Sequence, residues 1–68
     1  MNIEERIYQL CEKLMNLGYY RFQVKHIMQT VIGNNDMDSA NGDQQLRIVN
    51  ILENYEKLAN DYFFAYSK

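Results

Sequence analysis

Cys11 and His26 are the two residues that could form a catalytic nucleophile and its base, since the chain holds one cysteine and one histidine. Such a pair works only when the thiol and the imidazole come within hydrogen-bond reach. Cys11 falls on the apolar side of one helical pattern and His26 on the polar side of the next, so we expect them to face apart. The sequence therefore predicts a buried structural thiol at Cys11, no catalytic residues and no enzymatic activity.

The acidic loop at residues 34–43 does not have the spacing of a calcium-binding loop. An EF-hand loop has acidic ligands at its odd positions, a glycine at position six and a glutamate at position twelve. When Gly42 takes the glycine position, Met37 falls first and Ile48 twelfth. A glycine-rich phosphate loop and the Cys/His spacing of a zinc site are also missing. We therefore expect no metal and no cofactor.

The composition limits the remaining classes of function. Seven Lys and Arg against nine Asp and Glu give a net charge of −2, which makes nucleic acid an unfavourable partner. The first ten residues lack the basic start and apolar run of a secretion signal, and no stretch approaches the ~20 apolar residues of a membrane span. Together with a lone cysteine, these features predict a cytoplasmic protein with no membrane contact.

The elements that position these side chains are three amphipathic segments, which predict a single all-α domain covering residues 1–68. The first segment spans about 2–17 and repeats its apolar residues at spacings of four and three. It begins at Asn2, a capping residue, and ends before Gly18, because glycine adopts the left-handed conformation that terminates helices.

The second and third segments are predicted at 21–32 and 43–66. Gly33 ends the second segment. Asn41 and Gln44 form a capping box before the third, in which each side chain bonds to the other residue's backbone N–H.

The long C-terminal helix is distinguished by the width of its apolar face, which covers roughly 200° where a single contact needs about 100°. A short chain without disulfides or metals buries too little surface to be very stable, and a symmetric dimer could cover the surplus. We therefore predict a homodimer that acts through protein–protein interaction or regulation, with this helix as its packing and dimerisation element. The predicted interface residues are Ile51, Tyr55, Leu58, Tyr62, Phe63 and Tyr66.

A second surface is predicted on the polar side of the middle helix, where residues three and four apart become neighbours. This candidate partner patch consists of Phe22, Lys25, His26 and Gln29. The other interpretation is that Phe22 folds back over the turn onto Leu17 or Tyr19.

The helix-turn-helix layout of residues 12–32 leaves open an alternative function, that of a DNA-binding regulator. The side chains that would contact bases or phosphates are Arg21, Gln23, Lys25, His26 and Gln29.

A third alternative comes from residues 51–62, which read ILENYEKLANDY. This segment resembles the second helix of the small sporulation aspartyl-phosphate phosphatases, which are two-helix hairpins with the signature Ser-Gln-x-Leu-Asp before a Leu and a later Tyr. The corresponding residues here are Leu52, Glu53, Asn54, Tyr55 and Glu56, followed by Leu58 and Tyr62. The Ser-Gln pair is absent and the acidic residue is Glu. The resemblance implies a response-regulator partner, with Glu56 at the acidic position.

Overall fold

The computed structural model describes residues 2–33 and 40–66, with side chains up to Tyr62. These residues form three helices and no strand, which confirms the predicted all-α class. The helices are α1 (Ile3–Asn16), α2 (Arg21–Ile32) and α3 (Gly42–Tyr66). The predicted bounds agree with these to within a residue at each end. Most of the loop before α3 lies outside the described residues.

The helix starts confirm the predicted caps. The backbone N–H of Glu5 donates to Asn2 Oδ1 at 2.8 Å. Before α3, the N–H of Gln44 donates to Asn41 Oδ1 at 2.9 Å and the N–H of Asn41 to Gln44 Oε1 at 3.1 Å. The first N–H groups of a helix have no partner within it, and these side chains supply one.

The end of α1 confirms the predicted role of Gly18, which has a φ of 115°. Its N–H donates to Met15 O at 3.1 Å, and the N–H of Tyr19 donates to Leu14 O at 3.0 Å. This pair of bonds is a Schellman motif, which satisfies the last carbonyls of the helix and turns the chain sharply. The turn sends α2 back along the domain.

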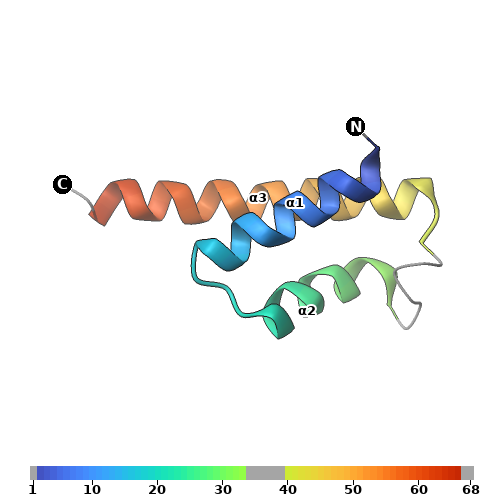
Figure 1. Ribbon diagram of the computed structural model, residues 1–68, viewed down its shortest axis with the longest axis horizontal. Helices are drawn as coiled ribbons and strands as arrows, with labels where there is room; N and C mark the ends of the chain where they lie inside the picture. Colours follow the sequence, from blue (N-terminus) through green and yellow to red (C-terminus); the bar gives the residue numbers. More distant parts are fainter. Residues whose placement is uncertain (1, 34–39, 67–68) are drawn as a thin grey trace.

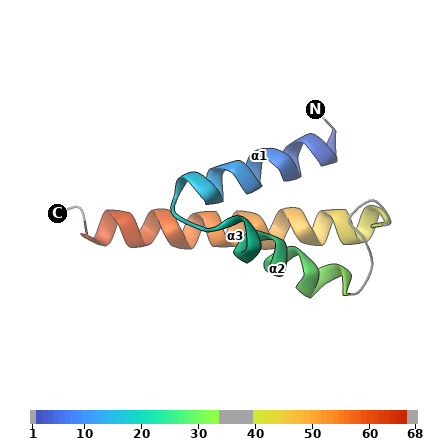
Figure 2. The same cartoon turned by 60° about the horizontal axis from the view of Figure 1, so that its bottom comes forward.

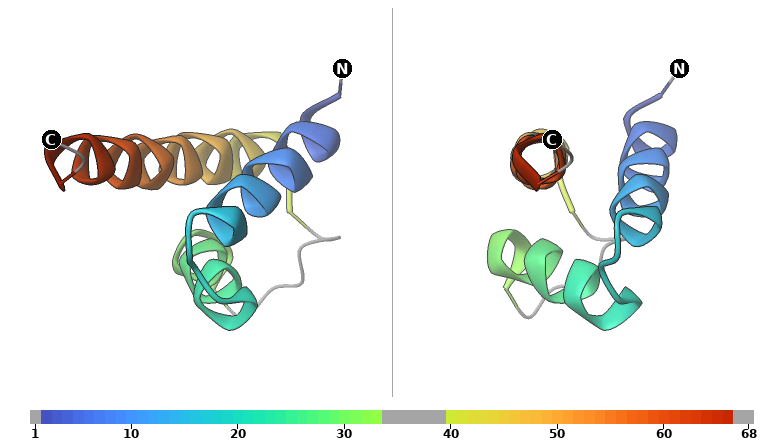
Figure 3. Two further views of the ribbon diagram at one scale, coloured as in Figure 1. Left: turned by 60° about the vertical axis from the view of Figure 1, so that its left-hand side comes forward. Right: turned by 90° about the vertical axis from the view of Figure 1, so that its left-hand side faces the viewer.

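The three helices pack with α3 against both of the others (Figures 1 and 2). α1 and α3 run in roughly the same direction and α2 runs opposite to them (Figure 1). Viewed along α3, the two shorter helices lie on two sides of it (Figure 3). The α1–α3 contact is the most extensive and the α1–α2 contact the least. The buried core residues are Ile7, Leu10, Leu14, Val24, Ile27, Ile32, Ile48 and Leu52.

α3 extends well past its two neighbours. Its buried residues Ile48 and Leu52 both lie in its first half, between α1 and α2. The second half begins with residues that still contact α1 and the turn after it, and its last turns project beyond the ends of α1 and α2, towards the C-terminus (Figures 1 and 3). The described domain is therefore elongated, measuring 43 × 25 × 15 Å. None of its described helices is long and apolar enough to cross a membrane.

Two ion pairs join α1 to α3. Arg6 Nη2 lies 3.6 Å from Glu53 Oε1, and Lys13 Nζ lies 3.6 Å from Glu56 Oε1. Arg6 and Lys13 are two turns apart on α1, and their partners are three residues apart on α3, so the pairs favour one register between the helices. Partly exposed pairs contribute about 0.2–1 kcal/mol each, which makes them guides to register rather than main sources of stability.

We predict that Gly18→Ala lowers the free energy of unfolding by about 1–2 kcal/mol, because a side chain disfavours positive φ. Open space surrounds the position, so the cost is conformational and not steric. Gly42→Ala is the matched control, also in open space but without a positive φ, and it should be neutral or stabilise α3. Urea unfolding followed by circular dichroism measures both. Equal effects of the two substitutions would contradict the assigned role of Gly18.

Candidate functional site

The structure divides the predicted α3 interface into a half-buried part and an exposed part. Ile51 and Tyr55 pack against the domain's own core. The ring of Tyr55 meets Tyr19 edge to face, with centroids 6.1 Å apart and planes at 89°. Leu58 and Tyr62 are each 64% exposed. Phe63 and Tyr66 were also predicted at the interface, but their side chains lie outside the part of the chain whose side chains the structure describes.

The spacing of these four residues nevertheless places them along one side of α3. Ile51, Tyr55, Leu58 and Tyr62 are spaced by four, three and four residues, the spacing of the apolar seam in a coiled coil. We call this surface the α3 seam. The ring of Tyr19 packs against Tyr55 in its first half, and Leu58 and Tyr62 form its exposed second half. The exposed part of the α3 seam is therefore its C-terminal part.

On α2, the predicted fold-back of Phe22 onto Leu17 or Tyr19 is wrong. Phe22 stacks on Tyr20 instead, with centroids 5.8 Å apart and planes at 7°, and it remains 70% exposed. The reason is that the ring of Tyr19 turns towards α3 and packs on Tyr55. Phe22 is left with the neighbouring ring as its partner.

The remaining residues of the partner patch are exposed, as predicted for a polar helix face. Lys25, His26 and Gln29 line an open depression together with Phe22. Lys25 and Gln29 also border the space between α1 and α2.

The residues named for DNA contact do not all have the same surroundings. Gln23 Oε1 accepts a hydrogen bond from the Tyr20 N–H at 2.8 Å, which makes Gln23 a helix cap, one that the sequence did not indicate. Gln23, Lys25, His26 and Gln29 all border the depression described above, whereas Arg21 borders the space between α1 and α2.

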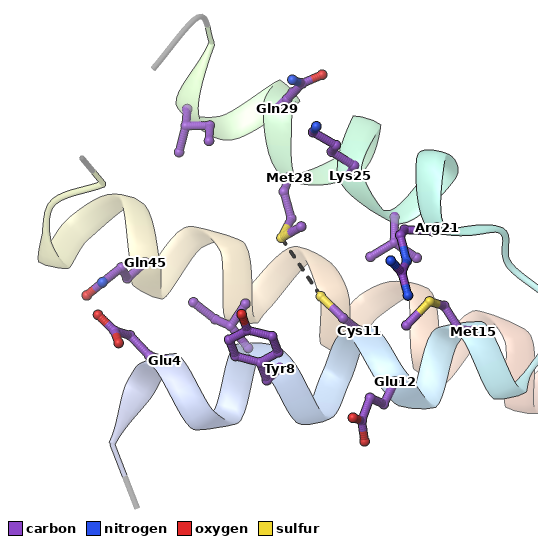
Figure 4. Close-up of a pocket in the computed structure, with 13 residues that line it drawn as sticks. Glu4, Tyr8, Cys11, Glu12, Met15, Arg21, Lys25, Met28, Gln29 and Gln45 are labelled. Atoms are coloured by element: carbon purple, nitrogen blue, oxygen red, sulfur yellow. Dashed lines mark hydrogen bonds between the residues drawn. The ribbon is translucent and has the colours of Figure 1, made fainter. Parts of the chain in front are cut away.

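Cys11 is half-buried, where the sequence predicted a buried thiol. Its Sγ–H donates to Met28 Sδ at 3.9 Å (Figure 4). Burial raises the pKa of the Cys11 thiol above its ordinary value, because the thiolate loses solvation. His26 is exposed and lines a different depression from the space that Cys11 faces. The thiol is therefore mostly neutral near pH 7 and, without an adjacent base, is a poor nucleophile.

The space that Cys11 faces is an open groove of about 570 Å³ between α1 and α2 (Figure 4). We call it the α1–α2 groove. The sequence did not identify it, although Tyr8, Cys11 and Met15 widen the apolar side of α1 beyond a single stripe. That widening was the available signal, because surplus apolar width indicates a second contact surface.

Glu56 lies in the contact between α1 and α3, where it pairs with Lys13 and its side chain is 21% exposed. This is the residue at the acidic position in the phosphatase resemblance. Its observed role is to join two helices of the same domain.

Searches for related proteins add no constraint on these surfaces. No protein-family model, no curated protein and no solved structure matches the chain. Across the described residues, no group of three or more His, Cys, Asp or Glu side chains could hold a metal ion.

We predict that Cys11 in the folded protein reacts with iodoacetamide more slowly at pH 8 than the same thiol in urea, because burial raises its pKa and leaves less thiolate. As the pH rises, the reaction rate of the unfolded chain should level off once its thiol is ionised. The reaction rate of the folded protein should keep rising at higher pH. Mass spectrometry of the alkylated fraction over time measures both rates. A folded protein that reacts faster than the unfolded one would contradict this placement of the thiol.

We also predict a coupling energy of about 0.2–1 kcal/mol between Lys13 and Glu56. The single and double alanine variants, unfolded in urea, give this value as a double-mutant cycle. High salt should reduce it, because salt screens partly exposed charges. Zero coupling at low salt would show that Glu56 is not held by Lys13.

Proposed function

We propose that the protein is a cytoplasmic homodimeric interaction module without catalysis, assembled through the projecting half of α3. The observation that carries this proposal is that Leu58, a large apolar side chain on the α3 seam, is 64% exposed. A second copy is the occupant we favour because two identical seams are complementary about a two-fold axis.

The charges beside the seam favour an antiparallel arrangement. Lys57 and Asp61 are exposed and four residues apart, so they lie on the same flank of α3. In an antiparallel pair of identical helices, each flank of one helix faces the same flank of the other. Lys57 of each chain would then lie opposite Asp61 of the other. A parallel pair would gain no such match on that flank.

The size of the exposed surface sets the strength of this contact. Burying a large apolar side chain completely contributes about 1.5–3 kcal/mol, and a two-fold contact buries Leu58 and Tyr62 from both chains. Association costs on the order of 4–15 kcal/mol in lost freedom of motion. A micromolar dimer requires a net gain of about 8 kcal/mol, so the rest of the α3 seam must contribute as well, and we expect a dimer that dissociates on dilution.

We predict that the wild-type protein sediments as a dimer at tens of micromolar and that Leu58→Glu converts it to a monomer. Tyr8→Glu is the matched control: Tyr8 is 73% exposed but lies on α1, away from the seam, so the dimer should remain. Circular dichroism confirms that each variant folds. A monomeric wild type, or a dimer unaffected by Leu58→Glu, would overturn the proposal.

The charges of Lys57 and Asp61 provide a separate test of the antiparallel orientation. Lys57→Asp or Asp61→Lys alone should weaken the dimer by placing like charges opposite each other. The double variant, with the two charges exchanged, should restore it. If the double variant is no better than either single variant, the antiparallel arrangement is wrong.

A further inference from the structure

The α1–α2 groove is an apolar channel between the two helices that touch each other least. Its base includes Ile7 and Val24, which belong to the buried core, and the half-buried Cys11, Met15 and Met28. Methionine side chains are flexible and polarisable, and they are common on surfaces that adapt to a partner. The base of the groove is thus apolar and able to change its shape.

The two sides of the groove carry opposite charges. Glu4 and Glu12 lie along α1, and Arg21 and Lys25 lie along α2 (Figure 4). All four residues are exposed. A ligand in the groove would therefore meet apolar side chains beneath it, carboxylates along one side and cations along the other.

We propose that the α1–α2 groove binds an amphipathic α-helix from a partner protein. The apolar stripe of that helix would be flanked by basic residues next to α1 and by acidic residues next to α2. Between Glu4 and Met15 the groove follows α1 for about 17 Å, which matches three turns of a bound helix. Helix-in-groove docking uses side chains at this spacing, and a helix here would complete a four-helix arrangement.

Tyr8 is the expected anchor of this contact. It borders the groove and is 73% exposed, although its ring is largely apolar. Tyrosines of this kind contribute strongly to interfaces, because they bury a large area and lose little conformational freedom. A helix in the groove would cover this ring.

The projecting half of α3 from a second copy fits the groove less well than a separate partner. Its Lys57 and Asp61 lie on the same flank, whereas the groove calls for opposite charges on opposite flanks. The groove and the α3 seam are therefore separate surfaces, and this inference does not depend on dimer formation.

Fluorescence anisotropy with designed peptides tests the proposal. The matched probe is a labelled helical peptide of about four turns, with leucines along one stripe, lysines on one flank and glutamates on the other. It should bind the full chain saturably, and a peptide with glutamates on both flanks should bind at least about tenfold more weakly. No saturable binding, or equal binding of the two peptides, would overturn the proposal.

Charge exchange locates the binding site. The double variant Arg21→Glu/Lys25→Glu should bind the matched peptide about tenfold more weakly and regain affinity for a peptide with lysines on both flanks. Glu12→Lys provides an independent check on the opposite side of the groove. Tyr8→Glu should lose binding, and Leu58→Glu should keep it. Variants that bind the matched peptide as the wild type does would place the contact elsewhere.

A peptide of residues 54–66 of this chain tests whether α3 of a second copy, rather than a helix of a partner protein, occupies the groove. The proposal expects it to bind the groove more weakly than the matched probe. If it binds more tightly and is sensitive to Tyr8→Glu, the groove belongs to a second copy of this chain and the proposal is wrong.

Discussion

The burial of Ile48 and Leu52 from α3 between the two shorter helices is the contact on which the rest of the structure depends. α1 and α2 touch each other little, so their relative position is set mainly by their separate contacts with α3. Because this core occupies only the first half of α3, two surfaces remain open. One is the projecting half of α3, and the other is the groove between α1 and α2.

The local structure could be predicted from the sequence because its causes are local. Asn2, Gly18 and the pair Asn41 and Gln44 mark helix ends through bonds to residues at most a few positions away, and each was identified correctly. Apolar residues at helical spacing identified all three helices. The same reasoning gave the all-α class without any knowledge of how the helices pack.

The division of the α3 surface could not be predicted, because it depends on where other helices end. Periodicity places Ile51 and Leu58 on the same side of α3 with nothing to distinguish them. The structure half-buries Ile51, which packs against the core, and leaves Leu58 64% exposed. Phe22 and Cys11 were misjudged for a related reason. Tyr19 packs on Tyr55 of α3 and leaves Phe22 to stack on Tyr20, and Met28 of α2 meets the thiol of Cys11. The charged sides of the α1–α2 groove likewise come from two different helices.

Amide hydrogen exchange at two protein concentrations tests the central claim most directly, because it reports on each part of α3 separately. If the projecting half is an assembly surface, the amides of residues 57–62 should become more protected between low and high micromolar concentration. Those of residues 46–54 should change little, since the domain's own core already covers them. Protection at 57–62 that is independent of concentration would contradict the account.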